Sequence, residues 1–252
     1  MKQPHICLDE SLGIRYAILP GDPARIDRIA EFLDSPQEIA YNREFRSLCG
    51  SYKGVRILAL STGIGGCSAG IAAEELRNIG IKAMIRTGSC GALQKGIGLG
   101  DLIIVSGAVR DDGTSKTYVP EIYPAYADIQ LLSCILSAAE ENGVRWVEGL
   151  AHSHESFYHD EADAVSDYWS ARGVLGADME SAALFTIGRL RGVKAASILN
   201  NVVLYGQDTA DAIGDYVGGE SLTAIGEKNE ILVALEAFVK LDRQMNGREK
   251  AV

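Results

Sequence analysis

The feature that most constrains the fold is a glycine turn that joins an apolar run to a segment with helical spacing. The run is residues 16–19 (YAIL), and the turn is residues 20–25 (PGDPAR). We predict a strand, a turn and a helix start, because Asp22 can accept a hydrogen bond from a free amide of the first helical turn. Gly21 lets the backbone approach a ligand, and Arg25 adds a cation one turn later. The unit is therefore able to bind a phosphate-like anion.

Two further glycine-rich segments follow apolar runs, residues 61–66 (STGIGG) and 86–91 (RTGSCG). A Gly-Asp-Pro sequence alone is also a common turn. Three such segments after three strands favour a binding site over a plain turn, because the ends of parallel strands meet at one edge of a sheet. We expect the three segments to converge on one anion.

The apolar runs are rich in Ile, Val, Leu and Ala, which favours buried and largely parallel strands. They lie at residues 16–19, 55–61, 83–86, 102–106 and 195–199. Helical spacing of apolar residues predicts helices at 128–142, 180–191 and 221–245, with glycines after the first two as C-caps. We expect one α/β domain over residues 1–252, a three-layer α/β/α sandwich around a central mixed, largely parallel sheet.

Composition narrows the classes of partner. The net charge is −10, which disfavours binding to a nucleic acid or an anionic membrane. No apolar run approaches about 18 residues, and residues 1–5 lack the apolar core of a signal peptide, so we expect a cytoplasmic protein. The five cysteines contain no Cys-x-x-Cys pair and predict reduced thiols, and the four histidines do not form a metal set. The histidines at 152, 154 and 159 lie on a stretch that we expect to be a solvated loop.

In its motifs the chain resembles the hexameric branch of the nucleoside phosphorylases, which contains uridine phosphorylases and the bacterial and apicomplexan purine nucleoside phosphorylases. The resemblance covers nearly the whole chain. The segments that carry it are 20–23 (PGDP), 42–45 (NREF), 61–66 (STGIGG), 86–91 (RTGSCG), 109–113 (VRDDG), 156–158 (SFY) and 178–182 (DMESA). It implies reversible phosphorolysis of a nucleoside to a free base and ribose 1-phosphate, with phosphate as co-substrate and no cofactor or metal.

The resemblance implies a phosphate site made of Gly21, Arg25, Arg86, Ser89 and an Arg43 lent by a neighbouring subunit. Three guanidinium groups can meet the oxygens of a near-dianion with charge-assisted hydrogen bonds. The alternative for each arginine is an exposed surface position. We assign catalytic roles to Arg25 and Arg86, which orient the attacking phosphate.

The implied ribose site consists of Met179 behind the sugar and Glu180, whose two carboxylate oxygens suit adjacent hydroxyls. Glu180 is also favoured at a helix start by the helix dipole. His5 resembles the N-terminal histidine that reaches a neighbour's 5′-hydroxyl. If His5 and Arg43 both cross over, the smallest active unit is a dimer, and the family usually forms a hexamer as a trimer of dimers.

The base site departs from the family pattern. Phe157 matches the aromatic residue that stacks on the base, and we add Asp178, Glu161 and Asn200 to the predicted base contacts. Uridine phosphorylases carry a glutamine and an arginine shortly after this phenylalanine, where the present chain has residues 159–163 (HDEAD).

Purine phosphorylases place a catalytic aspartate where this chain has Asn201. Asparagine cannot donate a proton as a general acid, but its amide can hydrogen-bond N7 and a 6-oxo group. We assign Asn201 a catalytic role at the leaving base, and the alternative is that Asn200 and Asn201 cap a strand end. The pattern favours inosine or guanosine slightly. Uridine phosphorylase, a hydrolytic nucleosidase and a noncatalytic nucleoside-binding protein remain alternatives.

Overall fold

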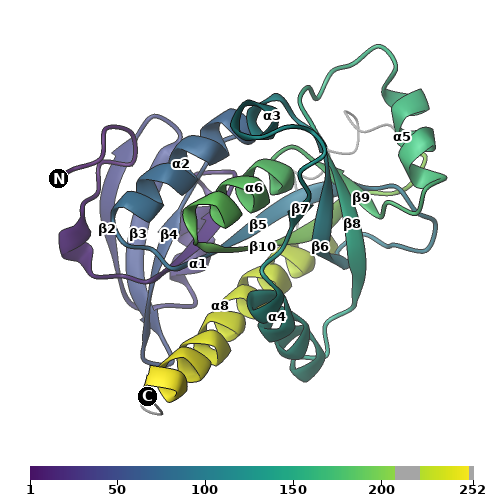
Figure 1. The fold of residues 1–252 in the computed structure, drawn as a ribbon. Coiled ribbons are helices and arrows are strands. Elements are labelled where there is room, and N and C mark those ends of the chain that lie inside the picture. The colour runs from purple at the N-terminus through teal and green to yellow at the C-terminus, as the bar shows by residue number, and fades with distance from the viewer. Residues whose placement is uncertain (208–221, 250–252) are drawn as a thin grey trace.

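The computed structural model describes residues 1–207 and 222–249, which form a β-sheet with helices on both sides (Figure 1). The strands are β1 (Tyr16–Pro20), β2 (Asp34–Asn42), β3 (Phe45–Tyr52), β4 (Val55–Leu60), β5 (Ala83–Ala92), β6 (Leu102–Asp111), β7 (Ala125–Tyr126), β8 (Trp146–His154), β9 (Gly176–Asp178) and β10 (Lys194–Val203). The helices are η1 (Glu10–Leu12), α1 (Arg25–Ala30), α2 (Gly66–Asn78), α3 (Gly113–Tyr118), α4 (Ile129–Glu141), α5 (Ala162–Ser170), α6 (Ser181–Arg191) and α8 (Leu222–Glu249).

The sheet is mixed, and the helices cover it in two layers. Helices α2, α3 and α6 pack together on one face, and α4 and α8 pack together on the other (Figure 1). Strands β4, β1, β5 and β10 run parallel at the centre, whereas β2 and β3 form an antiparallel edge. Strands β10, β6, β8, β9 and β5 pair in that order. Because β5 also pairs with β10, these strands form a closed ring. The predicted α/β sandwich around a mixed sheet is confirmed.

The glycine segments lie around the end of β1. Thr87 on β5 pairs with Pro20 on β1 and with Ile198 on β10, so β1 ends beside the middle of these two longer strands. The glycine turns after β1 and β4 lie side by side, because the Gly63 amide donates to the Gly21 carbonyl at 2.9 Å. The three glycine segments are therefore neighbours, and their convergence on one anion stays a prediction.

Local structure in this region differs from the prediction in two places. Asp22 accepts a hydrogen bond from the Ala24 amide at 2.9 Å, so it closes the turn, and α1 begins only at Arg25. Residues 86–91 do not follow β5 but belong to it, because the backbone there pairs with β10 and β9.

Helices α4 and α6 form where the spacing predicts them. The Asp128 side chain accepts from the Leu131 amide at 3.0 Å and starts α4. Gly192 ends α6 in the left-handed region with φ 67°. The expected loop around His152 is wrong, because this residue lies on β8, is buried, and hydrogen-bonds Asp111. Burial is the main cause that lowers the pKa of His152.

The start of helix α8 does not follow the predicted apolar face. Leu222 and Ile225 are 62% and 57% exposed. The buried positions of the first three described turns include Glu227 and Glu230. Further along, Phe238 is buried as expected, while the predicted start at Ser221 lies outside the described residues. None of the helices in the described part of the chain has the length and apolar character needed to cross a membrane.

Candidate active site

Arg86 lies on β5, beside the end of β1. Its side chain is 7% exposed, and its Nε lies 3.2 Å from Oδ2 of Asp178. Its Nη2 forms an ion pair with Oε2 of Glu180. The guanidinium folds back over Gly88, where an added Cβ would lie 2.5 Å from Nη2. Only glycine at residue 88 leaves room for this position of the arginine.

Glu180 immediately precedes α6 and is 4% exposed. Its Oε1 accepts a hydrogen bond from the Gly65 amide at 2.6 Å, so the carboxylate joins α6 to the glycine turn after β4. Burial raises the pKa of Glu180, while the positive charge of Arg86 opposes that shift and Asp178 adds to it. A small cavity separates Arg86 and Glu180 from Leu19 and Thr62. The predicted phosphate arginine and the predicted ribose carboxylate are therefore in direct contact.

Asp178 supports this pair from within the protein. Its Oδ1 accepts from the Ser153 hydroxyl at 2.6 Å, and its Oδ2 accepts from the amide and the hydroxyl of Ser181. Both oxygens are thus engaged by groups of the chain itself. The predicted contact of Asp178 with the base stays a prediction, and the geometry favours a role in fixing Arg86.

Arg25 lies on α1 with its side chain 5% exposed. Its Nε is 3.2 Å from Oε2 of Glu227, and its Nη1 is 3.3 Å from Oε1 of Glu230. The sequence analysis missed both glutamates, although two acidic residues on one face of a largely apolar helix were a detectable irregularity. Gly21 and Ser89, the other predicted phosphate contacts, are half-buried.

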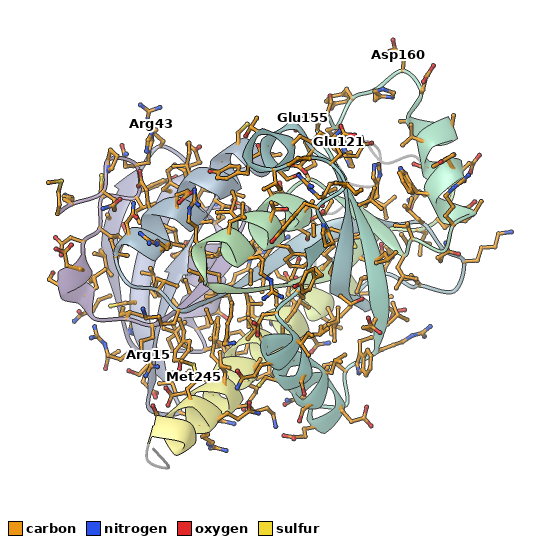
Figure 2. All side chains as sticks on the ribbon, in the orientation of Figure 1. Arg15, Arg43, Glu121, Glu155, Asp160 and Met245 are labelled. Atoms are coloured by element: carbon orange, nitrogen blue, oxygen red, sulfur yellow. The ribbon has the colours of Figure 1, made fainter. Side chains whose placement is uncertain are left out.

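Arg43 and His5 lie together on the surface. Arg43 is at the tip of the turn between β2 and β3, has φ 56°, is exposed, and points outward from the body (Figure 2). The neighbouring Asn42 donates from Nδ2 to the His5 carbonyl at 2.8 Å. The His5 ring is 37% exposed, and its Nδ1 lies 2.6 Å from Glu75. A single chain therefore does not direct Arg43 toward the buried Arg25.

The two asparagines near the end of β10 are fully buried. Nδ2 of Asn201 donates to the Gly98 carbonyl at 2.9 Å, and Nδ2 of Asn200 donates to the Thr223 carbonyl at 2.8 Å. Within the described residues neither Oδ1 has a hydrogen-bond partner. Both side chains thus bond backbone of other segments, the loop before β6 and the start of α8. The base-binding role of the two asparagines stays a prediction.

The remaining predicted base contacts lie at the periphery. Phe157 is half-buried in the loop after β8, and its ring centroid lies 5.0 Å from that of Tyr158. Glu161 is exposed at the start of α5. Figure 2 shows the neighbouring Asp160 at the outer end of this loop, away from the sheet. Met179 is half-buried beside Glu180.

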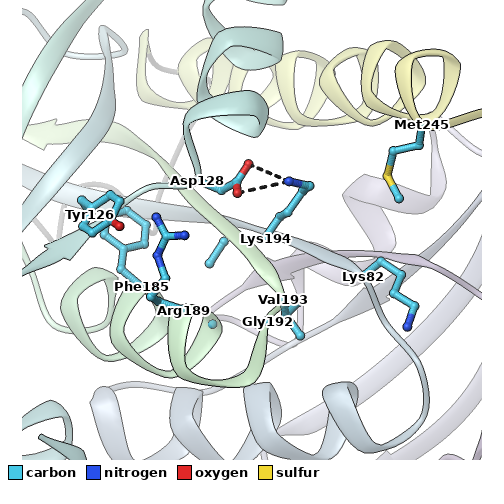
Figure 3. Close-up of a pocket in the computed structure, with 11 residues that line it drawn as sticks. Lys82, Tyr126, Asp128, Phe185, Arg189, Gly192, Val193, Lys194 and Met245 are labelled. Carbon is cyan, nitrogen blue, oxygen red and sulfur yellow. Dashed lines mark hydrogen bonds and ion pairs between the residues drawn. The ribbon is translucent and has the colours of Figure 1, made fainter. Parts of the chain in front are cut away.

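A larger hollow, of about 320 Å³, lies elsewhere (Figure 3). Lys82 and Lys194 border it at the amino ends of β5 and β10, and Lys194 pairs with Asp128 at 3.2 Å. None of the predicted site residues lines it. We therefore assign the candidate active site to the region around Arg86, beside the end of β1.

Comparison with known proteins finds relatives along most of the chain. Residues 15–206 match the family model described as the phosphorylase superfamily. The chain is 39% identical to a guanosine phosphorylase of Halorubrum lacusprofundi over 84% of this chain and 88% of the relative. It is also 39% identical to a uridine phosphorylase of Thermococcus kodakarensis over 99% of this chain and 90% of the relative.

Solved structures give the same result for the fold. A uridine phosphorylase of Vibrio fischeri superposes with a TM-score of 0.88 at 48% identity, covering 95% of this chain and 97% of that one. A purine nucleoside phosphorylase of Toxoplasma gondii in complex with immucillin-H gives 0.86 at 30% identity, covering 97% and 98%. The sheet and helices described above are thus shared with proteins named for purine and for uridine nucleosides.

Proposed function

The chain belongs to the phosphorylase superfamily, and from this membership we propose that it cleaves a nucleoside with inorganic phosphate to give a free base and ribose 1-phosphate. Its relatives are nucleoside phosphorylases, so the protein is a pentosyltransferase. The proposed reaction needs no cofactor apart from the phosphate co-substrate. The observation that supports the proposal most is the direct contact between Arg86 and Glu180.

This contact supports neighbouring sites for the two substrates. In the proposed reaction Arg86 and Arg25 bind phosphate oxygens, and Glu180 accepts hydrogen bonds from the sugar hydroxyls. A phosphate oxygen then attacks the anomeric carbon from the face opposite the departing base, and the negative phosphate stabilises the oxocarbenium-like sugar. No covalent enzyme intermediate is required.

For the base we propose a preference for 6-oxopurines. The Asn201 amide nitrogen has two hydrogens and donates to the Gly98 carbonyl, so its second hydrogen can donate to N7 or to a 6-oxo group. The glutamine and arginine that read uracil are absent from residues 159–163. The guanosine phosphorylase among the relatives is consistent with this preference. Uridine is the second candidate, because the Thermococcus and Vibrio relatives are named uridine phosphorylases.

A substrate panel tests both the reaction and the preference. We expect inosine and guanosine to be cleaved with a kcat/KM roughly tenfold above that of uridine, because one well-placed polar contact separates the bases. Free base and sugar phosphate are quantified for inosine, guanosine, adenosine, uridine and thymidine, each with and without phosphate. Faster cleavage of uridine would assign the protein to the second candidate.

The same panel separates the other chemistries. Release of free ribose without phosphate would identify a nucleosidase, and binding of nucleosides without any cleavage would identify a binding protein. Either result would contradict the proposed phosphorolysis. The charge of Arg25 and Arg86 favours phosphate, since water as nucleophile does not require two buried guanidinium groups.

We propose that the active site is shared between two copies of the chain, within a dimer or a hexamer of three dimers. Arg43 and His5 lie on one surface, and the nearby Tyr41 and Ile64 are 61% and 79% exposed. Exposed apolar side chains around a cation are typical of an interface. A neighbouring copy can then supply Arg43 to the phosphate.

Coexpression of two inactive variants tests this sharing. Arg43→Met and Glu180→Gln each disable a different half of a shared site. Random pairing leaves about one quarter of the sites with both wild-type residues. We expect coexpressed variants to recover about that share of wild-type phosphorolysis. Activity no higher than that of the separate variants would contradict the sharing of sites.

A further inference from the structure

Helix α8 places two buried carboxylates against Arg25, which the phosphate site needs. Glu227 and Glu230 are 2% and 0% exposed and lie almost one helical turn apart, so both side chains reach the same guanidinium. Glu227 also pairs with Arg28 on α1, whose side chain is 51% exposed. Two acidic groups thus occupy donors of Arg25 that an oxyanion would use.

The charges around this cluster leave little room for a further anion. Arg25, Arg28 and Arg86 face four carboxylates, which belong to Asp178, Glu180, Glu227 and Glu230. An added dianion would be repelled at short range in a region that excludes water. Binding becomes favourable when one of the carboxylates takes up a proton.

Glu230 is the carboxylate best suited to take that proton. Its Oε2 is buried and accepts no hydrogen bond within the described residues. Oδ1 of Asn200 lacks a donor too, and it lies against Gly226, one turn earlier on α8. Neither Glu230 Oε2 nor Asn200 Oδ1 receives a hydrogen bond within the described residues. A proton on Glu230 would add a hydrogen-bond donor to this face of α8.

We propose that Glu230 is a positioning residue that holds Arg25 while the phosphate site is empty and takes up one proton when an oxyanion binds. The step occurs above about pH 8, where Glu230 is ionised in the empty site. The proton comes from solvent and goes to the Glu230 carboxylate, which releases its hold on the Arg25 Nη1 donor. Arg25 then donates to the oxyanion. This inference rests on the proposed function, because it takes Arg25 as a phosphate ligand.

The surroundings of Glu230 place its titration in a measurable range. Burial raises the pKa of Glu230 to about 8, while Arg25 from α1 and Arg86 from β5 lower it, Glu227 from α8 raises it, and the Gly88 amide of β5 lowers it. Cys90 on β5 also faces this charge, and burial holds the pKa of its thiol well above the usual value. Because the Glu230 pKa is raised, its contribution to folding stability is present below its ordinary value of 4.5 and is lost as the pH rises through about 8.

The test measures binding of sulfate, an oxyanion that does not itself titrate in this range. Dissociation constants are determined by calorimetry between pH 6 and pH 9.5 for the wild-type protein, Glu230→Gln and Glu236→Gln. Glu236 lies further along α8 and binds Tyr52 and Lys53, so its variant is the matched control. We expect the wild type and the control to bind about tenfold more weakly at pH 9 than at pH 7.

The Glu230→Gln variant resembles the protonated form and is expected to bind with nearly the same affinity at both pH values. The same pH dependence in this variant as in the wild type would overturn the inference. Should the variant fail to fold, the wild type alone decides, through calorimetry at pH 9 in two buffers of different ionisation enthalpy. Uptake of about one proton per sulfate supports the proposal, and uptake of none overturns it. Failure of the wild type to bind sulfate or phosphate at any pH would instead refute the proposed function.

Discussion

Replacement of Arg86 by methionine is expected to lower kcat/KM for phosphorolysis by about a hundredfold to a thousandfold. The variant loses the guanidinium that binds phosphate in the proposed reaction, and it leaves the buried carboxylates of Asp178 and Glu180 without their cation. Removing one partner of a buried ion pair costs about 3–5 kcal/mol of folding stability. Steady-state kinetics with varied phosphate and urea denaturation measure the two effects.

Arg191→Met is the matched control for this prediction. Arg191 pairs with Glu74 at 2.8 Å, but both side chains are partly exposed, 38% and 26%. An ion pair in contact with water contributes only about 0–1 kcal/mol, so activity and stability should change little. A phosphate KM unchanged in Arg86→Met would show that Arg86 does not bind phosphate, whatever happens to stability.

Much of the fold follows from local sequence patterns. Strands such as β1 and helices such as α4 and α6 satisfy periodicity and capping rules within their own residues. Segment 86–91 was harder, because its glycines indicate a turn, whereas pairing with β9 and β10 keeps it extended. Glycine at residue 88 leaves space for the Arg86 side chain. Rules for turns and strands do not predict this requirement, because they do not consider the packing of other side chains.

Only part of the candidate site could be predicted from the sequence, and its charge balance could not. The motifs identify Arg25, Arg86 and Glu180, and the structure places all three in one region of buried ion pairs. The acidic partners of Arg25 lie some two hundred residues away, and only the packing of α8 brings them to it. Near its start the helix buries Glu227 and Glu230 against Arg25, while Leu235 and Phe238 further along are buried as their spacing predicts.

Replacement of Glu180 by glutamine is expected to lower kcat/KM for inosine by about a hundredfold to a thousandfold without weakening sulfate binding. The amide keeps an oxygen for the Gly65 amide but presents a donor where Glu180 Oε2 now meets Arg86 and where a sugar hydroxyl would donate. Removing a negative charge beside Arg86 leaves that guanidinium freer for an oxyanion. The two variants therefore differ, because Arg86→Met should weaken sulfate and Glu180→Gln should not.

Comparing ribose and deoxyribose substrates tests more directly whether Glu180 binds the sugar hydroxyls. A carboxylate that binds two adjacent hydroxyls loses part of its contribution when one hydroxyl is missing. The loss of kcat/KM in Glu180→Gln should thus be smaller for 2′-deoxyinosine than for inosine, measured under the same phosphate concentration. Glu74→Gln, at a partly exposed ion pair, should leave both substrates unaffected. Equal losses for the two nucleosides would show that Glu180 acts only through Arg86, and the carboxylate would then be a support for the phosphate site.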